Sequence, residues 1–315
     1  MIYEEFISTV QTTLNQRLGD GIRVTVLKVP KNNGTMLDGL CITRPDQKIS
    51  PTIYLNSFYE HWKSGVSMGE ILKEIVEIYA DGTAFPKLDP GILNDFNKLR
   101  DKVAFKLIHT GANRQFLEDL PSIPFLDLSI VFYLYLEEQE YGHMTAVIHH
   151  SHLKTWGVTA KELYRLAKQN TPRLLPPELK SMGEVIRDLC SSQMDDALTR
   201  QLLWEQHCMP EPAPLYVLTN TCGINGACVM LYEHALKNFA DLLEQDFIIL
   251  PSSIHEVLLV PYTEELCMEE LFEMVHEVNQ TEVPVEERLS DELYRYRRET
   301  DSISLVPRLT KYQTS

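Results

Sequence analysis

The amino-acid sequence predicts an α+β fold, in which antiparallel β-hairpins alternate with helices that pack on mixed or antiparallel sheets. Two observations support this class. Runs of alternating apolar and polar residues are joined by short turn signals, as the strands of a hairpin are. Between them lie segments with apolar residues every three or four positions and helix-capping residues at their start. Because hairpins and helices follow each other, adjacent strands should pair antiparallel and the helices should cover a sheet face.

The N-terminal part of the chain predicts a helix, a hairpin and a second helix, at residues 2–18, 22–43 and 67–82. Apolar residues four positions apart support the first helix, because that spacing places them on one helix face. The turn signal Asn32-Asn33-Gly34 joins the two strands of the hairpin. Ser67 and Glu70 form a capping box at the start of the second helix, and Asp81-Gly82 is expected to end it.

The middle of the chain predicts a helix, three strands and another helix, at residues 90–103, 103–108, 125–136, 144–152 and 159–169. The third of these elements alternates most clearly, with apolar residues on one face and Asp127 and Tyr133 on the other. Thr159 and Glu162 form a second capping box. Pro172 is expected to stop the helix that follows them.

The C-terminal part predicts two strands, a helix, a hairpin and two helices, at residues 215–219, 227–231, 232–244, 247–260, 264–278 and 290–298. The proline-rich stretch from Met209 to Pro214 is the strongest boundary signal in the chain. We therefore expect an N-terminal α+β region at 1–208, a C-terminal ββαββα region at 214–300 and a tail at 301–315. The sequence leaves open whether the two regions share one sheet.

Charge and cysteine usage restrict the class of protein. The chain of 315 residues has 45 acidic and 29 basic side chains and a formal net charge of −16, which would repel a phosphate backbone, so we expect no nucleic-acid partner. The N-terminus carries acidic residues, and no apolar run is long enough to span a bilayer, so neither a signal peptide nor membrane binding is expected. The six cysteines are scattered, as is typical of reduced thiols, which favours a cytoplasmic location.

Several short segments spread over nearly the whole chain carry a resemblance to a known family: Ser50–Asn56, Phe125–Leu128, Trp156–Thr159, Asn170–Pro176, Tyr216–Asn220, Leu250–Glu256 and Leu289–Asp291. In these segments the chain resembles DUF5688, a bacterial family of uncharacterised proteins. The resemblance implies family membership, but no activity, ligand or catalytic residue. Cys222 and Cys228 differ from what the resemblance leads us to expect at the 220–227 loop, so we expect no metal or redox role for them.

The segment Pro251-Ser252-Ser253-Ile254-His255-Glu256 lies between two apolar runs and carries groups able to do chemistry. In one interpretation a serine is the nucleophile, His255 is its base, and Glu256 orients the imidazole. In an extended chain, however, Ser253 and His255 lie about 7 Å apart and Glu256 points to the other side. A catalytic relay needs roughly 2.6 to 3.2 Å. The other interpretation is a turn whose serines bond backbone groups and whose imidazole contacts a neighbouring loop, such as the one with Asn220.

Histidines near residue 150 are candidate metal ligands. His150 and His152 would share one face of the predicted strand at 144–152, and two imidazoles there could begin a zinc or iron site. The chain has no His-Glu-x-x-His helix to provide a third ligand. A strand end in solvent is the alternative. The glycine segments lack the P-loop lysine and the Rossmann spacing, so we expect no nucleotide and no other cofactor.

Aromatic residues leave two interpretations open. Tyr133 and Tyr135 lie on the polar side of the predicted central strand. If that side is exposed, they mark a binding surface or a contact between copies in a homo-oligomer, because tyrosine is favoured at such places. If the sheet is covered on both faces, they belong to the core.

The absence of an assembled catalytic motif leads to the functional hypothesis. We expect a non-catalytic cytosolic binding or regulatory module that contacts a protein or a small ligand, with Asn220, Ser253 and His255 as candidate ligand contacts. The alternative is a hydrolase whose pocket gathers five polar residues: Ser252, Ser253, His255, Glu256 and Asn220.

Overall fold

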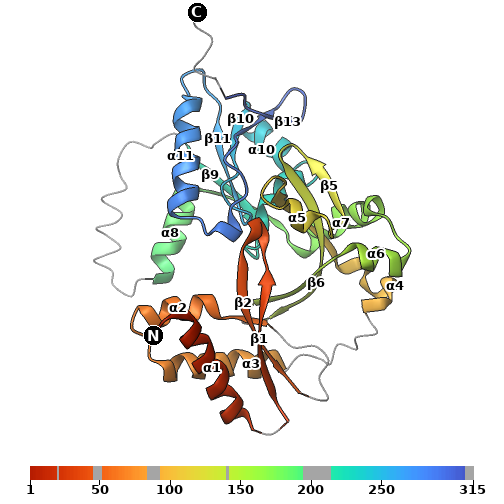
Figure 1. Cartoon of the computed structure of the whole chain (residues 1–315). Coiled ribbons are helices and arrows are strands. Elements are labelled where there is room, and N and C mark those ends of the chain that lie inside the picture. Colours follow the sequence, from red (N-terminus) through yellow and green to blue (C-terminus); the bar gives the residue numbers. More distant parts are fainter. Residues whose placement is uncertain (20, 45–51, 84–92, 140–141, 194–213, 309–315) are drawn as a thin grey trace, which may run out of the picture.

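The computed structural model of this protein describes residues 1–19, 21–44, 52–83, 93–139, 142–193 and 214–308. The strands in this part of the chain form three antiparallel sheets, and helices pack against them, so the predicted α+β class is confirmed. Figure 1 shows an N-terminal unit with its own helices, from which one long hairpin reaches up to the rest of the molecule.

The N-terminal unit contains a three-stranded sheet in the order β1-β2-β3 and its own hydrophobic core. Its elements are α1 (Tyr3–Leu18), β1 (Arg23–Pro30), the 3-10 helix η1 (Asn32–Gly34), β2 (Met36–Thr43), β3 (Thr52–Tyr54), α2 (Leu55–Lys63) and α3 (Met68–Thr83). Of the side chains spaced four apart on α1, Phe6, Val10 and Leu14 are fully buried in this core, as the sequence predicts, and Leu18 is partly buried. The Ser67–Glu70 capping box also forms: Glu70 Oε2 accepts from the Ser67 amide at 3.0 Å, and Ser67 Oγ accepts from the Glu70 amide at 3.3 Å.

The middle sheet has the order β4-β6-β5, and β7 also pairs with β6. This part of the chain contains α4 (Phe96–Leu99), η3 (Arg100–Lys102), β4 (Val103–His109), α5 (Arg114–Leu117), β5 (Ser122–Phe125), β6 (Leu128–Gln139), β7 (Gly142–Val147), α6 (His150–Trp156) and α7 (Ala160–Leu174). The inner faces of β4 and β6 share one core with α7, η4, α10 and the strands of the third sheet, given next.

The third sheet has six strands in the order β13-β12-β10-β11-β9-β8. Its elements are β8 (Pro177–Ser181), α8 (Met182–Gln193), β9 (Tyr216–Asn220), η4 (Gly226–Leu231), α10 (Ala235–Leu243), β10 (Phe247–Leu250), β11 (Val257–Pro261), α11 (Met268–Thr281), η5 (Val285–Glu287), β12 (Tyr294–Arg297) and β13 (Ser302–Leu305). Helix α11 packs on the outer face of this sheet, through apolar residues that include Leu271, Phe272 and Val275. The sheet therefore has a core on each side.

Strand β8 precedes the expected boundary and β9 follows it, yet the two strands pair, so both parts of the chain contribute to one sheet. The boundary stretch itself, apart from Pro214, lies outside the described residues. The expected tail at 301–315 includes β13, which pairs with β12 at the edge of the sheet.

Two predicted C-terminal elements are wrong. Residues 227–231 form the 3-10 helix η4 and not a strand, and nearly all of them are buried, so their apolar run reflects burial and not alternation. A Cβ at Gly226 would lie 2.2 Å from the carbonyl oxygen of His255, and this close approach fixes where η4 begins. The polar segment at 290–298 contains strand β12 and not a helix, because Tyr294 and Tyr296 alternate with arginines and face the core.

Three predictions in the middle of the chain also need correction. Helix α7 continues through Pro172 to Leu174, because Thr171 Oγ1 accepts from the amide of Phe105 on β4 and thereby holds the last turn. The clear strand begins at Leu128 and not at residue 125, since Leu126 has a φ of 53° and ends β5 in a turn. Of the helix expected at 90–103, the described residues contain the short α4 and η3.

The tip of the β1–β2 hairpin ties the three parts of the molecule together. The Asn33 side chain donates to the carbonyl oxygens of Val285 at 2.8 Å and Arg288 at 2.7 Å, in the segment before β12. Its Oδ1 accepts from Asn113 Nδ2 at 2.7 Å, and its amide donates to Asn113 Oδ1 at 2.7 Å. The neighbouring Asn32 donates to the carbonyl oxygen of Glu286 at 3.0 Å. The hairpin tip thus lies between the loop after β4 and the segment around η5.

Asn33→Ala should lower the free energy of unfolding by roughly 2 kcal/mol, because it leaves the partners of part-buried hydrogen bonds unsatisfied and places alanine at a φ of 58°. Asn33→Gly is the matched variant. It removes the same side-chain bonds but tolerates the positive φ, so it should be about 1 kcal/mol less destabilising. Urea denaturation of both variants measures this difference. Equal midpoints for Asn33→Ala and the wild type would contradict the role given to the hairpin tip.

Candidate functional site

The turn from Pro251 to Glu256 connects β10 to β11 and packs against the segment that precedes β12. The Ile254 amide donates to the carbonyl oxygen of Glu287 at 2.8 Å, and the Leu289 amide donates to that of Ser252 at 3.1 Å. Ser253 and Arg288 form an isolated antiparallel bridge. The turn is therefore fixed on one side by backbone hydrogen bonds.

The candidate nucleophile Ser253 is committed to this turn. Its side chain is buried, with 5% of the residue exposed, and its Oγ accepts from the backbone amide of His255 at 2.9 Å. Thr219 Oγ1 donates to the carbonyl oxygen of His255 at 2.8 Å, so this stretch of backbone is held from both ends. Among the described residues, Ser253 Oγ therefore bonds the main chain of its own turn and not an imidazole nitrogen.

The His255 imidazole lies on the loop that follows Asn220. Its Nδ1 is 3.3 Å from the amide nitrogen of Asn225 and 3.2 Å from the carbonyl oxygen of Gly223, and the tautomer decides which of the two it bonds. Its Nε2 is 3.7 Å from Glu287 Oε1. The carboxylate beside this imidazole is thus that of Glu287, and not the Glu256 that sequence reasoning selected. Only the tertiary structure brings Glu287 here, since it lies more than thirty residues further along the chain.

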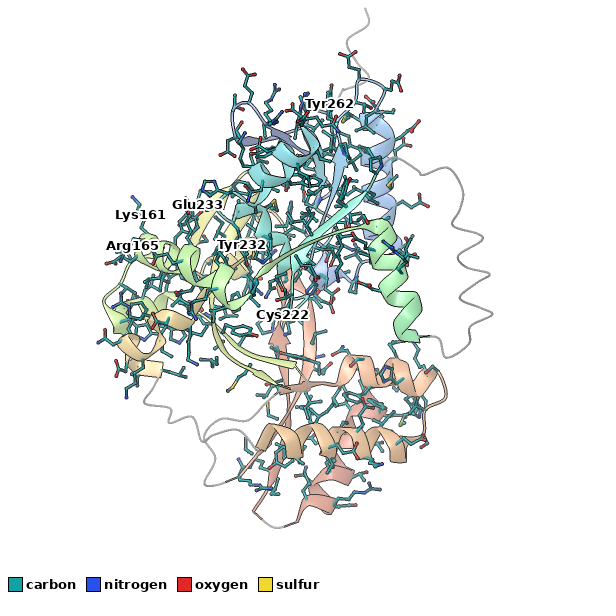
Figure 2. All side chains as sticks on the ribbon, turned by 180° about the vertical axis from the view of Figure 1, so that it is seen from behind. Lys161, Arg165, Cys222, Tyr232, Glu233 and Tyr262 are labelled. Atoms are coloured by element: carbon teal, nitrogen blue, oxygen red, sulfur yellow. The ribbon has the colours of Figure 1, made fainter. Side chains whose placement is uncertain are left out.

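The Asn220 side chain bonds the backbone of the loop that follows it. Its Nδ2 donates to the carbonyl oxygen of Ile224 at 2.7 Å, and its Oδ1 accepts from the Cys222 amide at 3.0 Å. The residue is 1% exposed. Figure 2 shows Cys222 at the end of the sheet nearer to the N-terminal unit and Tyr262 toward the opposite end. The structure therefore brings Asn220, Ser253 and His255 together, but their polar atoms bond the backbone of two adjoining turns.

The prediction that His150 and His152 share one strand face is wrong. Strand β7 ends at Val147, and both histidines lie in the first turn of α6. Residues two positions apart point to different sides of a helix, so the two imidazoles do not converge. His152 Nδ1 accepts from the His149 amide at 2.9 Å and caps the helix, while its ring stacks on Trp156 with centroids 5.2 Å apart. Among the residues that the structure describes, no three His, Cys, Asp or Glu side chains are grouped as metal ligands would be.

An open groove lies beside this helix. It has a volume of about 650 Å³ and is lined by Glu118, Asp119, His150, Leu153, Lys154, Gly157, Val158 and Thr159. The two walls are connected: the His150 amide donates to the carbonyl oxygen of Asp119 at 3.0 Å, and His149 Nδ1 lies 2.7 Å from Asp119 Oδ2. Sequence reasoning did not predict this groove, although the capping box at Thr159, which lines the groove, could have indicated a helix start there.

Asp127 is a second polar centre that sequence reasoning did not single out. Its Oδ2 accepts from Ser290 Oγ at 2.5 Å, its Oδ1 accepts from the Tyr294 hydroxyl at 2.7 Å, and its Oδ2 is 3.8 Å from His109 Nε2. Burial, together with the Asp127 carboxylate, raises the pKa of Tyr294 far above its ordinary value. Ser290 also accepts from the Glu292 amide at 2.9 Å. These contacts join the middle sheet to the third sheet, so the role of Asp127 that they support is structural.

Acid should destabilise the start of α6. Burial, and then the nearby His149, lower the pKa of His152, although Asp119 opposes this effect. A neutral His152 is favoured in the folded state, so its contribution to stability is present above the unfolded-state pKa of about 6.5 and is lost as the pH falls below it. Protonation also removes the lone pair that accepts from the His149 amide.

His152→Gln keeps a capping acceptor but does not titrate, so its melting temperature should fall less than that of the wild type between pH 7 and pH 5. His61→Gln, a change at an exposed histidine, serves as the control. Thermal unfolding of the three proteins over this pH range measures the effect. Parallel curves for His152→Gln and the wild type would exclude His152 as a cause.

The comparisons with known proteins give one match. A family model described as "Family of unknown function (DUF5688)" matches residues 3–298. No curated protein and no solved structure matches the chain. None of the described helices is both long enough and apolar enough to cross a membrane. Because the family match covers nearly the whole chain, the protein belongs to DUF5688.

Proposed function

We propose that this protein is a non-catalytic binding module of the bacterial cytoplasm, and that the groove beside α6 holds an extended peptide segment of a partner protein. The observation that carries the proposal is the groove itself, which combines an open shape with charges of both signs. The bacterial and cytoplasmic assignments rest on the family resemblance and on the scattered cysteines, four of which are free thiols in the described part of the chain.

The chemistry of the groove fits a peptide. Glu118 and Asp119 provide carboxylates along one wall, and Lys154 provides a cation on the other. Leu153 and Val158 are half-buried and offer apolar surface between them. A peptide backbone with mixed side chains can satisfy acidic, basic and apolar surfaces together, and an open groove leaves room for the chain to enter and leave at its ends.

Hydrogen bonds fix the backbone between α6 and α7, which forms part of the groove wall. Gly157 ends α6 with a φ of 68°, and its amide donates to the carbonyl oxygen of Leu153 at 2.9 Å. Thr159 then starts α7 through its capping box, in which Glu162 Oε2 accepts from the Thr159 amide at 2.7 Å. A preformed surface loses less conformational entropy on binding, which favours recognition.

The alternative function is a hydrolase built around Ser252, Ser253, His255, Glu256 and Asn220. The geometry of the five residues does not support it, because Ser253 Oγ and the Asn220 side-chain amide bond the main chain.

The net charge of −16 supports a protein partner over nucleic acid. A homo-oligomer remains one form that the partner could take, with a second copy supplying the segment.

Peptides selected from a random phage-displayed library on the immobilised protein test the groove. Those that bind should lose about tenfold in affinity, or about 1.4 kcal/mol, with Lys154→Glu or His150→Ala, because both side chains are exposed on the groove wall. Lys73→Glu is the matched charge change on a distant surface helix and should bind as the wild type does. Isothermal titration calorimetry measures the affinities. Failure to select any binder, or binders indifferent to both groove variants, would contradict the proposal.

A fluorophosphonate probe separates the binding module from the hydrolase. Activated serine nucleophiles react with such probes, and we expect the native protein to remain unlabelled because Ser253 is buried and bonded to its own turn. Labelling detected by mass spectrometry and abolished by Ser253→Ala, but not by Ser57→Ala, would favour the enzyme instead.

A further inference from the structure

Two Asn-Gly dipeptides occur in the chain, Asn33-Gly34 and Asn225-Gly226. Asparagine is chemically labile, and a following glycine has no side chain to hinder the reaction. In deamidation the glycine amide nitrogen attacks Cγ of the asparagine side chain, and the side-chain nitrogen leaves as ammonia with the proton of that amide. Water then opens the cyclic imide to aspartate or isoaspartate. The two dipeptides are therefore candidate modification sites.

The two asparagines have the same backbone conformation but different surroundings. Both have positive φ values, 58° at Asn33 and 50° at Asn225. Gly34 is exposed at the hairpin tip, and a Cβ placed on it would meet no atom within 4 Å. Gly226 is buried, and a Cβ placed on it would lie 2.2 Å from the His255 carbonyl oxygen. The main chain around Gly34 thus has room to move, whereas that around Gly226 does not.

The Asn33 side chain is held away from the Gly34 amide by its hydrogen bonds. Its Nδ2 donates to the carbonyl oxygens of Val285 at 2.8 Å and Arg288 at 2.7 Å, and its Oδ1 accepts from Asn113 Nδ2 at 2.7 Å. These three bonds must break before the side chain can turn back onto its own main chain. Local opening of an exposed tip costs less free energy than unfolding of a buried turn. Asn33 is therefore the more accessible of the two sites.

We infer that Asn33-Gly34 is a deamidation site that is gated by the docking of the hairpin tip, and that the reaction undocks the tip permanently. The docked tip is protected, and each opening exposes Asn33 to attack by the Gly34 amide. This inference concerns the joint between the N-terminal unit and the third sheet. It does not depend on the function proposed for the groove beside α6.

The product cannot dock as asparagine does, because the atom that leaves is the one that anchors the tip. Deamidation replaces Nδ2, which donates to the carbonyl oxygens of Val285 and Arg288, by an oxygen that can only accept. The new carboxylate would face these two oxygens without a proton to share. Glu286 and Glu287 add like charge in the same segment. Isoaspartate also lengthens the main chain of the tip by one carbon atom. Because the ammonia is lost, the change is not reversed by closing.

Peptide mapping by mass spectrometry measures both sites in one sample of the full chain, incubated at mildly alkaline pH in buffer and in concentrated urea. In urea the two asparagines should react at similar rates. In buffer Asn33 should react about tenfold more slowly than in urea, and Asn225 more slowly still, because its turn opens only when the protein unfolds. Equal rates at the two sites in buffer, or an Asn33 rate that urea leaves unchanged, would overturn the inference.

Asn113→Ala should speed the reaction of Asn33 several-fold in buffer, because it removes the side chain that bonds both Oδ1 and the backbone amide of Asn33. The rate at Asn225 in the same sample shows whether the rest of the fold is intact. Asn97→Ala, a change at an exposed residue of α4, is the matched control and should leave both rates as in the wild type. An Asn33 rate that Asn113→Ala does not change would show that docking does not gate the reaction.

Asn33→Asp introduces the product side chain without the reaction, and Asn33→Gly removes the same hydrogen bonds without adding a charge. Hydrogen–deuterium exchange should be fastest in Asn33→Asp at residues 31–36 and 284–290, slower in Asn33→Gly and slowest in the wild type. Exchange in α7 should be the same in all three proteins. Wild-type exchange at the tip of Asn33→Asp would contradict the undocking of the tip by deamidation.

Discussion

The contacts of Asn33 at the tip of the β1–β2 hairpin are the constraint on which the arrangement of the molecule depends. The N-terminal unit has its own core and shares little apolar surface with the other sheets, so its position is set mainly by this polar anchor. The Asn33 side chain donates to two carbonyl oxygens in the segment before β12 and accepts from the side chain of Asn113, which follows β4. The backbone amide of Asn33 donates to the same Asn113 side chain. Hydrogen bonds are directional, and a geometry fixed by several of them specifies one orientation where apolar contact alone would tolerate several.

Most of the polar residues that look reactive are used to make such connections. Ser253, His255 and Asn220 hold two adjoining turns, and Asp127 joins the middle sheet to the third sheet. Buried polar atoms must find partners, and irregular turns between strands leave many backbone groups without one. Side chains with short polar groups are the usual solution. A serine, a histidine and a carboxylate can therefore lie close together for reasons of folding, with no reaction to perform.

Tyr133 and Tyr135 are both buried on the second face of the middle sheet, so they belong to the core and not to an exposed binding surface. The groove beside α6 is a different kind of surface, since its walls are exposed, carry both signs of charge and are already bonded to each other.

The sequence alone determined the features that depend on neighbours along the chain. It predicted correctly the capping boxes at Ser67 and Thr159, the buried face of α1 and the α+β class, because these rest on spacings of three or four residues or on alternation. It misassigned residues 227–231, the segment with β12 and the start of α6, where burial by distant elements overrides local preference. The partner of His255 and the role of Asp127 were decided only by the tertiary structure. Each depends on atoms that lie far apart in sequence and meet only when the three sheets come together.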